Sequence, residues 1–318
     1  MGYGIGMTEH MNSAIFTRGL TKVYTSFGSR GGPSLEDLNL EITENEVFGF
    51  LGRNGAGKTT TIKLLCSLLR PTRGAAHIFG ERTRTARARR LIGYLPENPY
   101  FYEYLTPRET LDFYGRLQGM KKPARDAEWE KLAHLLDLND IADQRVRSFS
   151  KGMRQRLGFA VALVGDPPLL ILDEPMSGLD PMGRRAIREL IVKMRDEKKT
   201  IFFSSHVLSD VEQICDRIGI LVKGKLSVAG KMKQLLTDKI SLVEVVIAGI
   251  TEATAKALAV KTESTRLTDE GYRFRIANLD SANDLVHASR EHGGHLVEFT
   301  PVKESLEDYF VREQGAAS

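Results

Sequence analysis

Cysteine is scarce in this sequence, and its scarcity excludes two classes of protein. The 318 residues contain only Cys66 and Cys215, and each stands in a segment of regularly spaced apolar residues. Two distant cysteines cannot form the disulfide framework of a small secreted domain, and their spacing matches no zinc motif. We therefore expect both thiols to be reduced and buried, in a protein of the cytosol.

Long hydrophobic runs are also missing. No segment approaches the roughly 18 consecutive apolar residues of a membrane-spanning helix. The start of the chain, MGYGIGMTEHMNS, has no charged region followed by an apolar one, so it does not match a secretion signal. We expect residues 1–13 to be a disordered tail and no part of the chain to cross a bilayer.

A strong excess of one charge is the third absence. There are 45 lysines and arginines against 41 aspartates and glutamates, which leaves a net charge of +4. This small excess offers no argument for a nucleic-acid partner. The densest basic stretch, ERTRTARARR at residues 81–90, is interpreted as a solvated face, with binding to anionic lipid or an acidic partner as the alternative.

What is present is the composition of an ordinary globular protein, with 42% hydrophobic and 27% charged residues. The length suggests about two domains. In residues 14–237, apolar runs of strand length alternate with amphipathic stretches, which predicts an α/β domain with a covered sheet, and residues from about 98 to 165 have helical spacing. Residues 238–318 follow the order β-α-β-β-α-β, which predicts a small ferredoxin-like α+β unit.

The nine residues GRNGAGKTT, Gly52–Thr60, match the phosphate-binding pattern G-x-x-x-x-G-K-[ST] between a predicted strand and a predicted helix. Glycines let backbone N–H groups approach phosphate oxygens, and the helix N-terminus adds partial positive charge. Lys58 can reach the β- and γ-phosphates, and the Thr59 hydroxyl can ligate Mg²⁺. We predict a nucleotide site made by Gly52, Asn54, Gly55, Ala56, Gly57, Lys58, Thr59 and Thr60.

Two acids end the apolar run LLILDEP. Asp173 stands at the C-terminal end of the predicted strand, where open α/β sheets bind ligands, so it is placed to hold Mg²⁺. Glu174 follows directly, and a carboxylate beside the metal can orient or deprotonate the water that attacks the γ-phosphate. The alternative is that both acids merely solvate a loop.

The segment FSKGMRQRLGFA, residues 149–160, predicts a second helix N-terminus suited to phosphate. Ser150 is a good N-cap, and Gly152 allows close approach of the backbone to a ligand. One γ-phosphate does not need two such helix ends in a single subunit. We infer either that this end serves a nucleotide bound to a partner subunit, or that it is an ordinary capped helix.

Two shorter signals follow. Asp180 closes the stretch MSGLD, and His206 ends the strand TIFFSSH. That strand is predicted to lie beside the strand of Asp173, which would bring His206 near a γ-phosphate; the alternative is a structural histidine.

The ordered set of motifs resembles the nucleotide-binding subunit of ATP-binding cassette (ABC) transporters over residues 14–235. The resemblance implies that Gly52–Thr60 is the Walker A loop, that Asp173 ends the Walker B strand and that Glu174 is the catalytic base. His206 would be the switch histidine and, with Glu174 and Lys58, would complete the catalytic set.

The resemblance also assigns the remaining motifs. FSKGM stands where the family has LSGGQ, so the signature residues acting in trans would be Ser150, Lys151, Gly152 and Met153. SGLD would be the D-loop, with Asp180. Tyr24 would stack on adenine, with a core tyrosine as the alternative.

Two departures from the family pattern point to one branch. Glu97 follows GYLP where the family usually has glutamine, and Lys151 and Met153 replace a glycine and a glutamine of the signature. Both changes resemble the bacterial ABC-2 type exporters, which include subunits linked to drug efflux, sodium export and gliding motility. The segment SLEDYF resembles the end of the C-terminal domain of that branch.

The resemblance therefore implies an ATPase that converts ATP and water to ADP and phosphate, with Mg²⁺ held by Thr59, Glu97 and Asp173. We expect a homodimer with two ATP molecules at its interface and a separate integral membrane permease, at the cytoplasmic face of the inner or plasma membrane. The aromatic residues of Glu97–Thr106 would contact that permease, with core packing as the alternative. The transported substrate is not encoded in these motifs.

Two rival classes remain. A soluble ABC ATPase acting on ribosomes or DNA usually carries two cassettes or a long coiled coil, and this chain shows one cassette and no heptad run. A small-molecule kinase with the same phosphate loop would not explain FSKGM and SGLD. A neighbouring reading frame with about six apolar segments of ~20 residues would favour transport.

Overall fold

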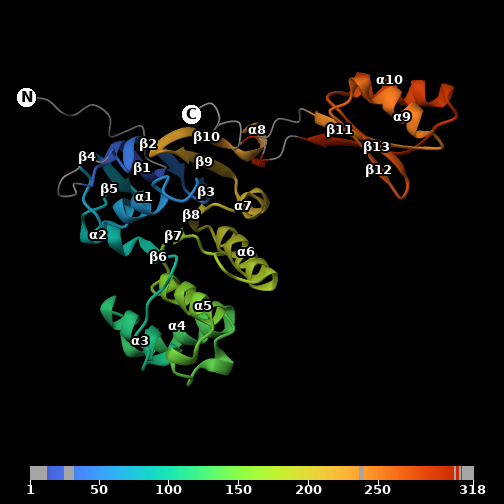
Figure 1. Ribbon diagram of the computed structural model, residues 1–318. Helices are drawn as coiled ribbons and strands as arrows, with labels where there is room; N and C mark the ends of the chain where they lie inside the picture. The colour runs from blue at the N-terminus through green and yellow to red at the C-terminus, as the bar shows by residue number, and fades with distance from the viewer. Residues whose placement is uncertain (1–12, 25–31, 236–239, 304–305, 308, 310–318) are drawn as a thin grey trace, which may run out of the picture. The chain divides into compact units, whose positions relative to one another are not determined.

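The computed structural model describes residues 13–24, 32–235, 240–303, 306–307 and 309 (Figure 1). The chain divides into two compact units, with the boundary between Met232 and Lys233, a few residues before the boundary expected from the sequence. The expected N-terminal tail lies outside the described residues except for Ser13, which already belongs to the first strand.

The first unit begins with an antiparallel sheet. Its order is β2-β1-β4-β5, with β1 central to the pairing. In β2 buried and exposed side chains alternate, because one face of the strand packs on the core and the other faces water. The bounds are β1 Ser13–Lys22, β2 Leu35–Thr43, β4 Arg73–Ile78 and β5 Glu81–Arg82.

A six-stranded sheet forms the centre of the same unit, in the order β10-β9-β3-β8-β7-β6. The strands from β9 to β6 run parallel, and β10 is an antiparallel edge. Strands β3, β7 and β8 are buried at every position, as expected where helices cover both faces of a parallel sheet. The bounds are β3 Val47–Leu51, β6 Ile92–Leu95, β7 Leu169–Asp173, β8 Thr200–Ser205, β9 Arg217–Val222 and β10 Lys225–Lys231.

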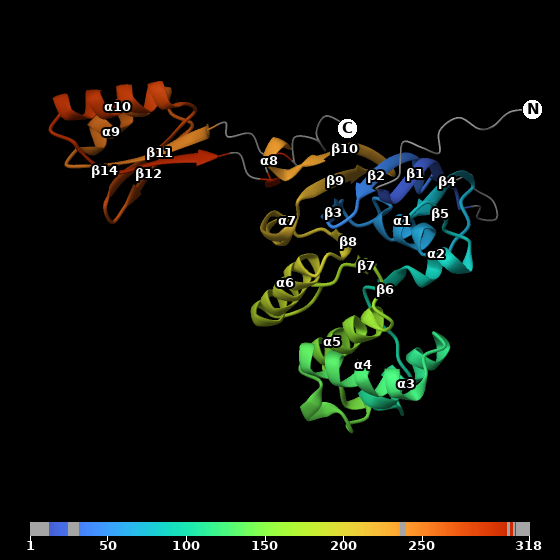
Figure 2. The same cartoon turned by 180° about the vertical axis from the view of Figure 1, so that it is seen from behind.

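Helices α3, α4 and α5 gather at the end of this unit away from the antiparallel sheet (Figures 1 and 2). Helix α3 starts at a capping box, in which the Thr106 hydroxyl accepts from the Glu109 backbone and the Glu109 carboxylate accepts from the Thr106 backbone. The α-helices are α1 Lys58–Leu65, α2 Ala86–Arg90, α3 Pro107–Leu117, α4 Lys122–Leu135, α5 Lys151–Leu163, α6 Pro181–Asp196, α7 Leu208–Ile214 and α8 Met232–Leu235. Two short 3₁₀ turns, Asn139–Ile141 and Val146–Ser148, separate α4 from α5.

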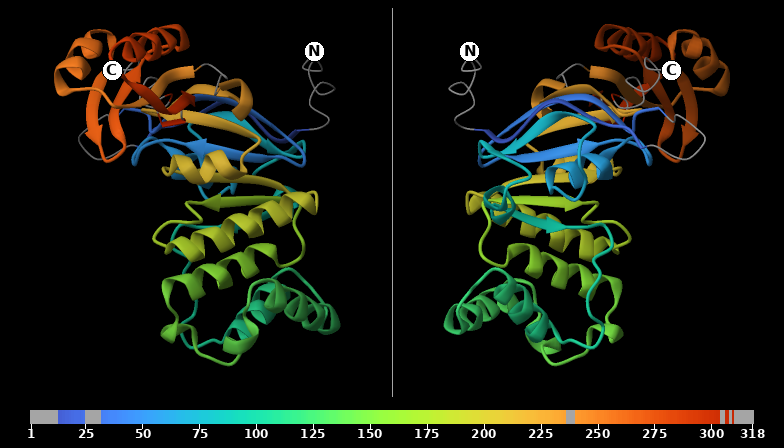
Figure 3. Two further views of the ribbon diagram at one scale, coloured as in Figure 1. Left: turned by 90° about the vertical axis from the view of Figure 1, so that its right-hand side faces the viewer. Right: turned by 90° about the vertical axis from the view of Figure 1, so that its left-hand side faces the viewer.

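The second unit is a four-stranded antiparallel sheet of order β12-β13-β11-β14 with helices α9 and α10 on one face (Figure 3, orange and red). This confirms the ferredoxin-like order expected from the sequence. The DEG turn is also confirmed, because Thr268 pairs with Gly271 across it. The bounds are β11 Ile240–Ala248, α9 Glu252–Leu258, a 3₁₀ turn Ala259–Lys261, β12 Ser264–Thr268, β13 Gly271–Ile276, α10 Leu279–Glu291 and β14 His295–Lys303. Of the segment SLEDYF, Ser305, Asp308 and Phe310 lie outside the described residues.

The structure bears on two further expectations. Cys66 is buried, but Cys215 is only partly buried, which corrects the expectation that both thiols would be buried. Burial raises the pKa of the Cys66 thiol, so this thiol stays protonated and unreactive near neutral pH. Within the described part of the chain, no helix has the length and apolar character needed to cross a membrane.

Candidate functional site

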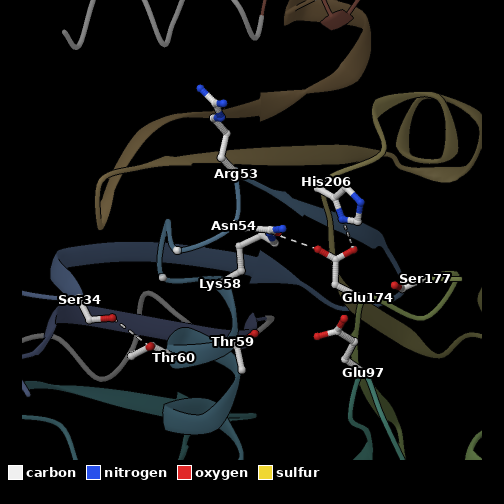
Figure 4. Close-up of a pocket in the computed structure, with 12 residues that line it drawn as sticks. Ser34, Arg53, Asn54, Lys58, Thr59, Thr60, Glu97, Glu174, Ser177 and His206 are labelled. Atoms are coloured by element: carbon white, nitrogen blue, oxygen red, sulfur yellow. Dashed lines mark hydrogen bonds and ion pairs between the residues drawn. The ribbon is translucent and has the colours of Figure 1, made fainter.

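The ends of the parallel strands surround a cavity of about 420 Å³ (Figure 4). Strands β3, β7 and β8 all end at this edge of the sheet, since they run parallel and in register. The lining residues are Ser34, Arg53, Asn54, Gly55, Gly57, Lys58, Thr59, Thr60, Glu97, Glu174, Ser177 and His206.

The glycine-rich loop between β3 and α1 is shaped for close approach of a ligand. Gly57 has φ +108°, and a Cβ there would lie 2.4 Å from the carbonyl oxygen of Ser34, so only glycine fits. Gly57 is also the N-cap of α1, and no side chain caps this helix. The first backbone N–H groups of α1 therefore remain available to an anion, at the positive end of the helix dipole.

Lys58 places an ammonium group at the centre of the loop. Its side chain is buried, and Nζ donates to the Gly52 carbonyl at 2.7 Å. The same Nζ lies 3.2 Å from Oε1 of Glu174. A buried lysine needs an anionic partner, and here one carboxylate supplies it.

The two acids after β7 have different environments. Oδ1 of the buried Asp173 accepts hydrogen bonds from the Ser204 hydroxyl at 2.7 Å and from the Thr59 hydroxyl at 3.3 Å. Glu174 has φ +47°, a left-handed conformation unusual for glutamate, which turns its side chain into the cavity. The Ser204 hydroxyl accepts from the Glu174 backbone N–H at 2.9 Å and so supports this turn.

His206 completes a row of three side chains. Its Nδ1 lies 2.8 Å from Oε2 of Glu174, whose other oxygen faces Lys58. Figure 4 shows Glu174 between the lysine and the histidine, with the Glu97 carboxylate on the same side of the cavity. The row can hold an anion through Lys58 and can accept a proton at Glu174.

The oxygen groups of Thr59, Asp173 and Glu97 suit a hard divalent cation. The Asp173 carboxylate and the Thr59 hydroxyl are 3.3 Å apart, and Glu97 lines the same cavity. Oxygen donors of this kind are those that Mg²⁺ prefers in nucleotide sites. Thr59, Asp173 and Glu97 are therefore the residues that would hold Mg²⁺.

Comparisons with known proteins agree on the family. Residues 35–177 match the ABC transporter family. The chain is 38% identical over 313 residues to an uncharacterized ABC transporter ATP-binding protein, all4389, of Nostoc sp. (strain PCC 7120 / SAG 25.82 / UTEX 2576), covering 96% of this chain and 91% of that protein. This chain is an ABC transporter ATP-binding protein. As a member of that family it is an ATPase of the P-loop type.

Two further similarities extend the identification. The ABC protein is 37% identical over 317 residues to the bacitracin transport ATP-binding protein BcrA of Bacillus licheniformis, covering 97% of this chain and 99% of BcrA. Among solved structures, the dimeric structure of MJ0796, a bacterial ABC transporter cassette, matches with a TM-score of 0.64 at 25% identity, over 69% of this chain and 99% of that one.

Most of the predicted site residues of this ABC protein meet in the cavity. The residues Asn54, Gly55, Gly57, Lys58, Thr59, Thr60, Glu97, Glu174 and His206 line it, and Asp173 accepts a hydrogen bond from the lining residue Thr59. Gly52 and Ala56 belong to the same loop, where Gly52 accepts from Lys58 and the Ala56 carbonyl accepts from Gly224. Tyr24 is 47% exposed, which excludes the core alternative, and its hydroxyl is 3.4 Å from that of Thr60.

The cavity lining of the same chain, as described, includes Ser177 at the start of the D-loop but not Asp180 or the signature residues Ser150, Lys151, Gly152 and Met153. Ser150 caps α5 by accepting from the Met153 backbone N–H at 3.3 Å. Asp180 caps α6 by accepting from the Gly183 N–H at 2.8 Å. Lys151 and Gly152 both approach the D-loop of their own chain: the Lys151 ammonium lies against Gly178, and Gly152 faces Leu179.

The sequence analysis missed four residues of the site. Ser34, Arg53 and Ser177 line the cavity, and Ser204 bridges the two acids after β7. Arg53 and Ser177 stood inside quoted motifs without a role. Ser34 and Ser204 reach the site only through tertiary structure. For Ser204, a prediction that β7 pairs with β8 would have placed it opposite Asp173.

Proposed function

We propose that this ABC protein is the ATP-hydrolysing motor subunit of an ABC-2 type membrane exporter. It works with a separate permease at the cytoplasmic face of the membrane. The observation that carries the motor function is the row Lys58–Glu174–His206 together with the hydrogen-bonded pair of Asp173 and Thr59. The exporter branch is supported by the similarity to BcrA, which extends over nearly the full length of both chains and so includes the second unit.

A homodimer is proposed because the signature residues Ser150, Lys151, Gly152 and Met153 are not among the residues described as lining the cavity of their own chain. The N-terminus of α5 is capped by Ser150, and neither Ser150 nor Gly152 is among the residues described as lining that cavity. In a two-fold dimer this end would reach the nucleotide of the partner, as expected for a self-complementary interface. The dimeric cassette structure that matches this fold supports such an arrangement.

The chemistry follows from the row of side chains. When ATP binds, its γ-phosphate offers Lys58 a stronger anionic partner than Glu174, so the glutamate is released from its ion pair. Glu174 can then accept a proton from the attacking water, while His206 holds the carboxylate through Oε2. Mg²⁺, when bound, would supply charge neutralisation of the phosphates.

The Glu174→Gln variant tests this proposal. It should bind ATP, because the loop and Lys58 are unchanged. Its rate of ATP hydrolysis should fall by about 100-fold or more. With ATP and Mg²⁺ it should form a dimer in light scattering, since the bound nucleotide is not consumed.

The matched control is Glu189→Gln, which removes an exposed carboxylate paired with Arg185 on α6. It should behave as the wild type in both assays. A Glu174→Gln protein that stays monomeric at high concentration with Mg·ATP would overturn the dimer, and one with normal turnover would overturn the role of the base.

Permease contact is proposed for the aromatic segment after Glu97. Tyr100, Tyr102 and Tyr104 are 83%, 49% and 62% exposed, whereas Phe101 is buried and accounts for the core packing of this segment. The rings of Tyr102 and Tyr104 lie 5.7 Å apart between centroids, so together they form a local aromatic surface. Exposed aromatic groups of this kind are typical of protein interfaces.

Alanine substitution of the three tyrosines should leave ATP hydrolysis by the isolated chain unchanged and abolish co-purification with the permease. The control is Leu117→Ala, which removes an exposed apolar group at the end of α3, outside the aromatic segment, and should leave co-purification unchanged. Intact co-purification and transport in the triple variant would refute this surface.

A further inference from the structure

A buried carboxylate lies outside the cavity and has no part in the mechanism above. Asp210 is on α7, which begins at Leu208 just after His206, and it is 2% exposed. A buried carboxylate is costly unless it is paired, so its partners define its role.

Both described partners of Asp210 come from the neighbouring helix α6. Arg188 donates from Nη1 to Oδ1 of Asp210 at 2.7 Å. Arg184 places Nη1 3.5 Å from Oδ2, an ion pair without a hydrogen bond. Helices α6 and α7 are therefore joined through one acid and two bases.

Arg184 also reaches the D-loop. Its Nε donates to the backbone carbonyl of Leu179 at 3.3 Å. Leu179 precedes Asp180, the N-cap of α6, so this contact holds the D-loop against the start of its own helix. One guanidinium thus contacts the D-loop on one side and Asp210 on the other.

The other end of the connection is His206. The residue follows β8, and the Ser205 hydroxyl accepts from the Val207 backbone N–H at 2.9 Å, which fixes the turn into α7. A shift of α7 therefore moves the backbone that carries His206. The contacts run from Leu179 through Arg184 and Asp210 to α7 and His206.

We propose that Asp210 is a positioning residue for ATP hydrolysis, which links the D-loop to His206 through Arg184. This inference rests on the proposed function, in which the D-loop lies at the interface with the partner subunit. A change at the partner's nucleotide then alters the placement of His206 beside Glu174, so Asp210 makes the two sites of the dimer cooperative.

The test compares Asp210→Asn with the wild-type chain in steady-state hydrolysis across ATP concentrations. The variant should lose on the order of tenfold in kcat, because a small misplacement near reacting groups is costly, while KM changes less than about twofold. Its Hill coefficient should fall toward one. Asp210→Glu, which keeps the charge, should recover part of both values.

Two further variants separate positioning from simple support of the fold. Arg184→Gln removes the link to Leu179 and leaves Arg188 paired with Asp210, so it should lower the Hill coefficient even if Asp210→Asn folds poorly. Glu189→Gln on the same helix breaks only an exposed pair and should change neither value. Thermal unfolding measures the folded fraction for each protein.

The inference would be overturned if Asp210→Asn and Arg184→Gln both had the same kcat and the same Hill coefficient as the wild-type chain. A loss of kcat that disappears after correction for the folded fraction would also overturn it. A wild-type chain that hydrolyses ATP without cooperativity contradicts the proposed dimer instead, and the kcat of Asp210→Asn then still decides whether the residue positions His206.

Discussion

At the scale of single residues, the site depends on backbone conformations as much as on side-chain chemistry. Glu174 points into the cavity because its φ is +47°, and this conformation is supported by the Ser204 hydroxyl. Gly57 has φ +108° beneath the Ser34 carbonyl. Glycine adopts such a conformation readily, whereas a glutamate keeps it only where neighbouring contacts hold it.

Gly57→Ala should lower ATP affinity by about tenfold or more and the free energy of unfolding by about 1–3 kcal/mol. The added Cβ would lie 2.4 Å from the Ser34 oxygen, so the loop must move. Binding of a fluorescent ATP analogue and urea denaturation measure the two effects.

Gly80→Ala is the control that measures only the conformational cost of placing alanine at a positive φ, without a steric clash. Gly80 has φ +75° but no atom within 4 Å of the added Cβ, and it does not line the cavity. It should lose stability without losing ATP affinity, and equal losses of affinity in the two variants would contradict the steric explanation.

At the scale of elements, helix N-termini organise the functional motifs. Helix α1 starts without a side-chain cap and leaves its N–H groups to a ligand, whereas α5 and α6 start at the caps Ser150 and Asp180. The D-loop acid therefore has a structural task in its own chain in addition to any contact across an interface.

Changes at Asp180 should separate these two tasks. Asp180→Ala should lower the free energy of unfolding by about 1 kcal/mol, because the Gly183 N–H loses its acceptor. Asp180→Asn keeps a capping oxygen and should retain most of the stability while losing the charge.

The measurement is urea denaturation together with ATP turnover. Reduced turnover in the stable Asp180→Asn protein would locate a role for the charge beyond capping. Equal stability of the alanine variant and the wild type would show that the cap contributes nothing.

At the scale of the whole molecule, each unit has its own hydrophobic core. The first is built around residues such as Phe48, Phe50 and Phe202, and the second around Val245 and Phe274. Separate cores of this size predict units that fold independently. The complete candidate cavity lies within the first unit.

A chain that ends at Leu235 should therefore fold and bind ATP with an affinity within about twofold of the full chain. Calorimetry of the full chain should show a second unfolding transition that the shortened chain lacks. A shortened chain without cooperative unfolding would show that the first unit depends on the second.

Much of the site could be predicted because its parts are local in sequence. The loop Gly52–Thr60 and the acids Asp173 and Glu174 occupy consecutive positions next to a strand, and the alternation of strands and helices placed them at one edge of a parallel sheet. The order of strands in the second unit followed from the same periodicities. Short-range patterns encode local structure, since the backbone of each element depends mainly on residues close to it.

Other features were decided only by the tertiary structure. Ser204 meets Asp173 across 31 positions of sequence because strand register pairs β7 with β8. Arg188 meets Asp210 across 22 positions because α6 packs beside α7. Neither pairing has a local signal, since such contacts depend on how elements pack and on the need of a buried charge for partners, and no short segment carries that information.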